Sequence, residues 1–286
     1  MSVTTTAPPA PQPPVHPVVT TVLEPRTGWR AIRFRELWHY RELLWILSLR
    51  DIKVRYQQTI LGAAWTVLQP LAYMLVFVAF FGGNAPKGVP PAIFFFCGLL
   101  PFQLFASTLS QASNSLVDNQ NLITKVYFPR LVVPIASSIT AMIDFCVALV
   151  VLLAMMALYR VVPTSRVLLL PAFVLVGAVA ALGMGLWLSA LNVEYRDVRQ
   201  AVPALVQFCM FLSPVLFPID AFPGGWKHYL LIANPLSGVV QGIRWCLLGL
   251  PLPLGLMISS TAIALGLLIS GLYYFRRMED RFADMV

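Results

Sequence analysis

Charged side chains are scarce in this sequence. Only 11% of its 286 residues are Asp, Glu, Lys or Arg, whereas 58% are hydrophobic, and the mean hydropathy is +0.77. This composition excludes an ordinary soluble domain, in which about 25% of residues are charged. It predicts a protein that spans a lipid bilayer.

The residue types that carry nucleotide or metal chemistry are also few. None of the four lysines follows a glycine and precedes Ser or Thr, which excludes a recognisable ATP-binding loop. The three histidines have no second ligand at metal spacing, and the four cysteines stand singly in apolar surroundings. The apolar stretches hold no cluster of carboxylates. We therefore predict that the chain is not an enzyme, has no catalytic or metal residues and binds no cofactor.

Residues 1–29 lack both the basic and the apolar region of a signal peptide. They are rich in Pro and Thr, and we expect a disordered tail there, followed by a helix at 30–57 and a transmembrane domain at 58–286.

Long apolar runs fill the rest of the chain. A helix needs about 20 apolar residues to cross the ~30 Å of hydrocarbon. Another apolar stretch, 229–250, is broken by Asn234-Pro235 and interrupted by Arg244, so we expect short re-entrant or interfacial helices there. The prediction is an all-α integral membrane protein with six spans, at about 60–81, 90–111, 131–159, 167–191, 201–219 and 252–275.

The net charge of +8 could indicate nucleic-acid binding, but the distribution of the cations argues against it. If both termini are cytoplasmic, fifteen Lys and Arg residues fall on the inside and five on the outside. This asymmetry follows the positive-inside rule, so it predicts orientation and accounts for the charge without nucleic acid.

Residues 30–57 contain no proline or glycine and should be helical. One face carries Trp38, Trp45, Leu49, Ile52 and Tyr56, which favours an amphipathic helix lying at the membrane interface. A helix packed on a soluble partner is the alternative. The segment QQTILG would join this helix to the first span, where neighbouring helices can compensate for a kink at Pro70.

Asp144 lies near the middle of the third span. An ionisable group there costs about 2.5–3.5 kcal/mol, so it should have a partner or face water. No Glu, His or Lys lies at a similar depth, and we favour a structural hydrogen bond over a proton relay.

Aromatic and small polar side chains recur in the spans and outside them. Aromatic faces and amide groups can contact sugars without holding a charge, although packing against lipid is the commoner role of such residues. The predicted channel-lining residues are Trp65, Tyr73, Phe77, Gln207, Phe208, Phe211, Phe217 and Trp226.

Two short segments between spans, 113–134 and 192–203, are polar and charged. They either dock on a soluble partner or simply connect the spans.

Four stretches resemble one family, in matching order: QQTILGAAWTVLQPL, NLITKVYFPRLVVPIAS, LNVEYRDVRQAVPALVQFCMFLSPVLFP and NPLSGVVQGIRWCLLG. They are similar to the permease subunits of bacterial polysaccharide and polyol-phosphate ABC exporters, of the ABC-2 type typified by the O-antigen exporter. The resemblance covers about residues 33–280.

The resemblance implies the ABC-2, or type V, exporter fold and a homodimer in the bacterial inner membrane. It implies two separate ABC ATPase subunits, which bind ATP and Mg, and export of undecaprenyl-pyrophosphate-linked polysaccharide, most of all O-antigen. Arginines at headgroup level would bind the lipid pyrophosphate, with Arg33, Arg35, Arg41 and Arg55 as candidates. The matching ATPase-coupling residues are Asp118, Asn121, Lys125, Tyr127, Glu194, Tyr195, Arg196 and Asp197.

Other functions stay open at this point. Teichoic acid, capsule, or a small drug or lipid could be the exported substrate. A membrane enzyme of glycan assembly is a further alternative, which the missing acidic cluster disfavours.

Overall fold

The computed structural model describes residues 38–57, 64–126, 128–219 and 224–279, except for the side chains of Tyr56 and Lys227. Internal contacts divide the chain into two units, residues 1–34 and 35–286, and every described residue belongs to the second. The predicted tail at 1–29 and the start of the helix predicted at 30–57 lie outside the described residues.

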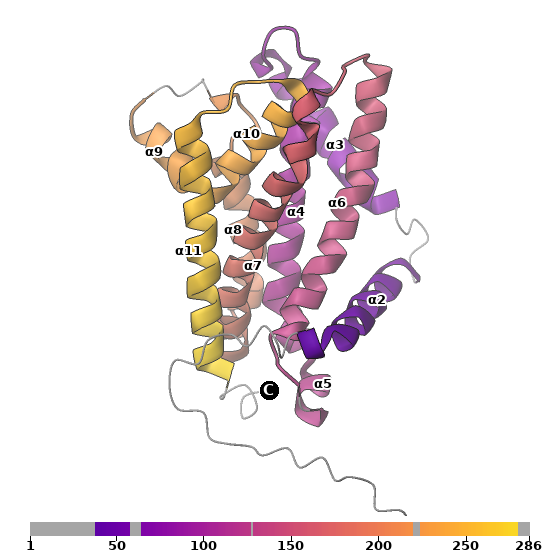
Figure 1. The fold of residues 1–286 in the computed structure, drawn as a ribbon, viewed down its shortest axis with the longest axis vertical. Coiled ribbons are helices and arrows are strands. Elements are labelled where there is room, and N and C mark those ends of the chain that lie inside the picture. Colours follow the sequence, from indigo (N-terminus) through magenta and orange to yellow (C-terminus); the bar gives the residue numbers. More distant parts are fainter. Residues whose placement is uncertain (1–37, 58–63, 127, 220–223, 280–286) are drawn as a thin grey trace, which may run out of the picture. The chain divides into compact units, whose positions relative to one another are not determined.

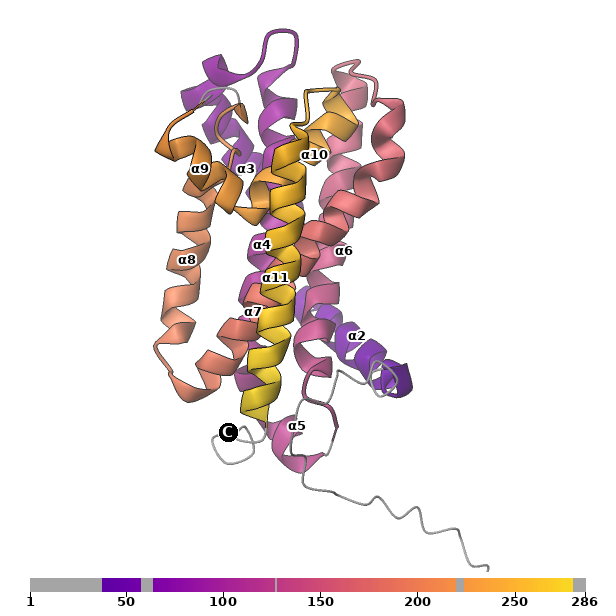
Figure 2. The ribbon, with the colours of Figure 1, turned by 60° about the vertical axis from the view of Figure 1, so that its left-hand side comes forward.

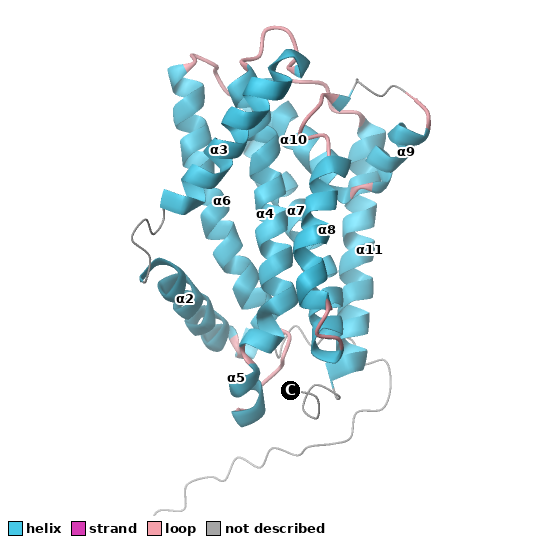
Figure 3. Cartoon of the chain, turned by 180° about the vertical axis from the view of Figure 1, so that it is seen from behind, coloured by secondary structure: helices cyan, strands magenta, loops and turns pink. Residues whose placement is uncertain are grey.

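The described residues form helices joined by short loops and contain no β-strand, which confirms the all-α prediction (Figure 3). Two short 3₁₀ helices, Gly82–Asn84 and Ser165–Leu169, precede α4 and α7. The α-helices are α2 (Arg41–Gln57), α3 (Ala64–Phe81), α4 (Pro91–Asp118), α5 (Gln120–Lys125), α6 (Val132–Leu158), α7 (Leu170–Glu194), α8 (Val198–Leu212), α9 (Trp226–Ala233), α10 (Pro235–Leu248) and α11 (Leu254–Glu279).

Five helical stretches are long and apolar enough to cross a membrane. They are Ala64–Asn84, Pro91–Asp118, Val132–Leu158, Ser165–Glu194 and Leu254–Glu279, and they match five of the six predicted spans. The predicted span 201–219 differs, because α8 ends at Leu212 after 15 residues. Pro214 disfavours helical geometry at the residue before it, and Ser213 is extended, with φ −98° and ψ 148°. A 15-residue helix is about 22 Å long, which is shorter than the ~30 Å hydrocarbon core.

Helix α4 lies at the centre of the bundle, in contact with α3, α6, α7, α8 and α10 (Figures 1 and 2). Most of its apolar span, 83%, is buried inside the protein. Phe94, Phe95 and Phe96 follow one another in this helix and are all fully buried. Helix α4 is therefore surrounded mainly by other helices of the protein.

Helices α7 and α11 approach each other closely through two glycines. A Cβ atom added at Gly271 would lie 2.2 Å from the carbonyl oxygen of Gly183. Small residues allow such backbone contact between membrane helices. Nearby, the Trp187 indole stacks on Tyr274 with 4.2 Å between ring centroids, and its Nε1 donates a hydrogen bond to Ser270 at 3.1 Å.

The segment predicted to hold short helices, 229–250, forms the end of α9 and the whole of α10. The Asn234 side chain accepts a hydrogen bond from the Leu236 backbone at 2.9 Å, and Pro235 is the first residue of α10. These are ordinary helix-start signals. Gly249 ends α10 with φ +70°, a left-handed conformation that glycine adopts without strain. Asn234-Pro235 therefore separates two helices rather than unwinding one.

Helix α2 lies obliquely against the lower part of α6, at the end of the bundle that carries α5 (Figure 1). Its buried residues are Leu47 and Ser48. Trp38, Trp45 and Leu49, from the predicted apolar face, are exposed. These three side chains are therefore available to a lipid or a partner.

Candidate functional site

The two segments predicted to dock on a partner lie next to each other. Arg199, in the first turn of α8, forms an ion pair of 3.2 Å with Asp118, the last residue of α4. Deeper in the protein, the Asn192 amide donates to the Ser113 carbonyl at 3.0 Å and to the Asn114 side chain at 3.1 Å. Segments separated by about 80 residues in the sequence thus form one face, which we call the coupling face and define as residues 118–126 and 194–199.

The predicted coupling residues are directed toward solvent. Seven of the eight, Asp118, Asn121, Lys125, Glu194, Tyr195, Arg196 and Asp197, are exposed, and Tyr127 lies outside the described residues. The charge of Glu194 and a hydrogen bond to it raise the pKa of Tyr195 above its ordinary value, so this phenol stays neutral. The coupling face therefore presents charges of both signs to any partner.

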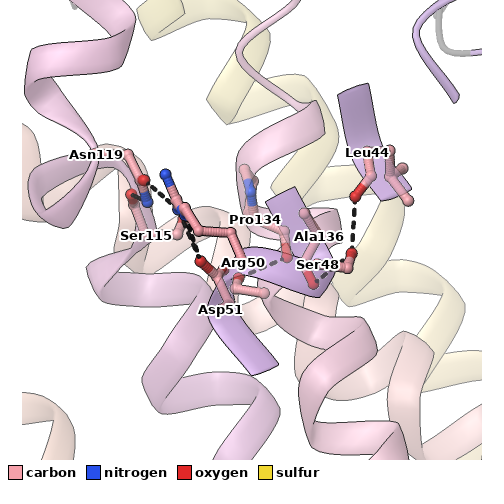
Figure 4. A network of polar contacts seen from close by, with 9 residues as sticks. Leu44, Ser48, Arg50, Asp51, Ser115, Asn119, Pro134 and Ala136 are labelled. Atoms are coloured by element: carbon pink, nitrogen blue, oxygen red, sulfur yellow. Dashed lines mark hydrogen bonds and ion pairs between the residues drawn. The ribbon is translucent and has the colours of Figure 1, made fainter. Parts of the chain in front are cut away.

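Helix α2 is attached to the coupling face by side chains that the sequence analysis did not single out. Arg50 donates a 2.6 Å hydrogen bond to the Asn119 side chain and pairs with Asp51 at 2.7 Å. Asn119, between α4 and α5, in turn donates to the Ser115 carbonyl at 2.8 Å. Ser48 donates to the Ala136 carbonyl of α6 at 3.2 Å (Figure 4). A polar run at a helix end is the signal that could have indicated Asn119.

One turn and a half further along α2, Arg55 reaches into the bundle and forms an ion pair with Asp144 of α6. Asp144 thus has the partner expected of an ionisable group in a span, and that partner is an arginine. The Asp144 side chain is 12% exposed and that of Arg55 38% exposed. Both line an open pocket of about 260 Å³, whose other polar lining residues are Thr66, Gln69, Gln103 and Ser107.

Arg41, another of the predicted headgroup arginines, does not line this pocket. Arg41 lies at the far end of α2, exposed, with its guanidinium 5.5 Å from the Trp38 ring. Arg33 and Arg35 lie outside the described residues.

The predicted channel-lining residues lie mainly on two helices that flank α4. On α3, Trp65 and Tyr73 are exposed, whereas Phe77 is buried against Phe95. On α8, Gln207, Phe208 and Phe211 are all exposed. Phe217 is partly buried and Trp226 is exposed. In Figure 3, α3 and α8 lie on either side of α4, and both contact it.

Arg244, which interrupts the apolar stretch 229–250, is fully buried in α10. Its guanidinium donates to the carbonyls of Pro214 at 2.6 Å, Val215 at 2.9 Å and Phe94 at 3.3 Å. It lies 3.7 Å from the Phe94 ring centroid. Arg244 therefore fastens the turn after α8 to both α10 and α4.

Sequence comparison identifies the family. Residues 42–248, well over half of the chain, match the ABC-2 type transporter family. The chain belongs to this family.

Several curated relatives of this ABC-2 transporter chain align over most of its length. It is 31% identical over 255 residues to the O-antigen export system permease protein RfbA of Myxococcus xanthus, which covers 88% of this chain and 98% of the relative. It is 26% identical over 249 residues to RfbA of Klebsiella pneumoniae, covering 86% and 95%. The polysialic acid transport protein KpsM of Escherichia coli is 26% identical over 245 residues, covering 82% and 92%.

Proposed function

We propose that the chain is the permease subunit of an ABC exporter for O-antigen carried on undecaprenyl pyrophosphate across the bacterial inner membrane. The similarity to RfbA over 88% of the chain is the observation that carries the proposal. The chain is also similar to KpsM, at a lower identity of 26%, so capsular polysaccharide is a second candidate. Teichoic acid or a small drug or lipid has no support among these relatives.

The energy would come from two separate ATPase subunits. The chain carries no recognisable ATP-binding loop, and the coupling face gathers exposed charges of both signs from two connections. Charged side chains on short rigid segments give directional contacts through which ATP-driven closure could move the spans. Both termini would lie on the cytoplasmic side, since α2, α5 and the last turns of α11, which carry many of the described cations, lie at one end of the bundle (Figure 1).

The working unit would be a homodimer with six spans in each copy. In this arrangement α8 and the turn at 213–219 together form the fifth span, and α9 and α10 form the outer re-entrant cap. The exposed aromatics of α3 and α8 would then line the space between two copies or contact the partner copy directly. Aromatic faces present sugars with a flat apolar surface, which suits a neutral polymer.

Deletion of the gene followed by complementation tests this function. We expect the deletion strain to lose surface O-antigen and to accumulate the glycan inside the cell, and the wild-type gene to restore export. Unchanged surface polysaccharide in the deletion strain would contradict the proposal and favour a drug or lipid substrate. Loss of capsule with O-antigen intact would favour the KpsM-like alternative.

A second measurement distinguishes the proposed permease from a membrane enzyme of glycan assembly. The purified chain should leave a lipid-linked sugar chemically unchanged and should hydrolyse no ATP unless it is co-purified with its ATPase. Turnover of the lipid-linked sugar by the chain alone would establish the enzyme instead.

A further inference from the structure

The pocket that contains Arg55 is built by four helices that are distant in the sequence. Arg55 comes from α2, Trp65 and Gln69 from α3, Gln103 from α4 and Asp144 from α6. Apolar residues of α4 and α6 complete the wall, including Leu100, Leu104, Ala141, Phe145 and Ala148. The pocket therefore combines one cation, one carboxylate, neutral hydrogen-bonding groups and an indole within an apolar bundle.

The Arg55–Asp144 ion pair stabilises the Arg55 guanidinium when no ligand occupies the pocket. A guanidinium among membrane helices is costly unless it is paired, and the carboxylate of Asp144 supplies the counter-charge. The same planar fork binds a phosphate oxygen pair as well as a carboxylate. An incoming phosphate would thus compete directly with Asp144 for Arg55.

The other lining groups match a sugar rather than a second charge. Thr66, Gln69, Gln103 and Ser107 offer neutral donors and acceptors, and Trp65, which is 53% exposed, offers an aromatic face. The volume of about 260 Å³ falls just below the ~300–1,000 Å³ of typical small-molecule sites. Such a pocket has room for a small head group and excludes a folded polymer.

We propose that this pocket binds the diphosphate of the glycan carrier with its first sugar, and that Asp144 is the resident carboxylate which the diphosphate displaces from Arg55. The inference rests on the proposed function and names the part of the substrate that this site recognises. Once displaced, Asp144 repels the bound diphosphate and keeps its binding weak enough for release. If the ion pair is instead permanent and structural, removal of the Asp144 charge has the opposite effect: it loosens the pocket and does not tighten ligand binding.

Binding to the purified full chain tests this proposal. The chain is placed in nanodiscs of phosphatidylcholine and titrated by calorimetry with a short-chain prenyl diphosphate that carries one sugar. We expect Asp144→Asn to tighten binding about tenfold, because it removes both the competitor and the repulsion. Arg55→Gln should weaken binding at least tenfold. Should Arg55→Gln not fold, Arg55→Lys replaces it and should also weaken binding, because an ammonium cannot form the parallel bonds of the fork.

A matched control lies on the same helix. Lys53 is exposed and does not line the pocket, so Lys53→Gln should bind the probe as the wild type does. Asp144→Asn binding no tighter than the wild type, or Arg55→Gln binding equally well, would overturn the proposal.

Two further ligands test which phosphate-containing molecule the pocket recognises. Inorganic pyrophosphate should bind more weakly than the sugar diphosphate, and equal affinity would refute the sugar contacts. Phosphatidylglycerol added to the nanodiscs should not displace the probe, and displacement would assign the pocket to ordinary lipid headgroups.

The test is independent of the gene-deletion experiment. Loss of surface O-antigen together with unchanged probe binding by the Asp144 and Arg55 variants would reject the pocket alone. Expected binding with surface O-antigen intact in the deletion strain would reject the proposed function alone.

Discussion

Replacement of Asp197 by Asn tests whether the coupling face binds the ATPase or only connects the spans. Asp197 is the residue at the N-terminus of α8, is exposed, and makes no side-chain capping hydrogen bond. Its effect on stability is therefore limited to the helix dipole, about 0.3–1 kcal/mol. At roughly 2–4 °C per kcal/mol for a domain of 150–250 residues, the melting temperature should fall by about 4 °C at most.

The expected effect on assembly is much larger. Loss of one partner from a hydrogen-bonded charge pair across an interface costs about 2–5 kcal/mol. At 1.4 kcal/mol per factor of ten, the lower figure weakens binding of the ATPase about thirtyfold. Co-expression with the ATPase, followed by dilution of the purified complex, measures this loss directly, and surface O-antigen reports its consequence.

Lys87 provides the matched control for Asp197→Asn. It is exposed in the loop before α4, at the opposite end of the bundle from α5, and Lys87→Gln should leave both assembly and export unchanged. If Asp197→Asn retains the ATPase on dilution and exports normally, this residue does not dock, and the segment 192–203 only connects α7 to α8.

Two further predictions concern packing and are checked by melting temperature in one detergent. Gly271→Ala should lower it strongly, because the new methyl group meets the backbone of Gly183, whereas Gly266→Ala should not, since nothing lies within 4 Å of that position. Arg244→Met removes the donor of the Pro214 and Val215 carbonyls, each worth about 1–3 kcal/mol when left unpaired. It should therefore destabilise more than Arg166→Met, which loses an exposed cation–π contact of about 0.5–1 kcal/mol; equal melting temperatures would refute this reasoning.

Five spans could be predicted from the sequence because the signal is local. A run of about 20 apolar residues has few alternatives to a membrane-crossing helix, and the helices found begin and end within a few residues of the predictions, apart from the longer α4. The predicted span 201–219 extends beyond the helix found there, because apolar residues continue past the helix end at Leu212. A hydropathy profile does not show where this helix ends, whereas the sequence Ser213-Pro214 is a local signal of a helix end.

The candidate sites were less predictable, because their partners are remote in the sequence. Arg55 and Asp144 were each singled out for separate reasons, but 89 positions separate them and only the packing of α2 on α6 joins them. From the sequence, Arg244 was only a charge that interrupts the apolar stretch 229–250. Its burial depends on three carbonyls supplied by α4 and the turn after α8.

These long-range polar contacts share a physical cause. The hydrophobic effect does not select one apolar face over another inside a bilayer, so close packing and interhelical hydrogen bonds select the arrangement of spans. Asn192 with Ser113, Asp144 with Arg55, and Arg244 with Pro214 each connect different segments of the described bundle. The Asn192 and Arg244 contacts use backbone carbonyls as acceptors, those of Ser113 and Pro214, and these packing contacts can stay closed during transport. The Arg55–Asp144 pair borders an open pocket instead. A ligand that binds Arg55 there can compensate for the loss of this ion pair.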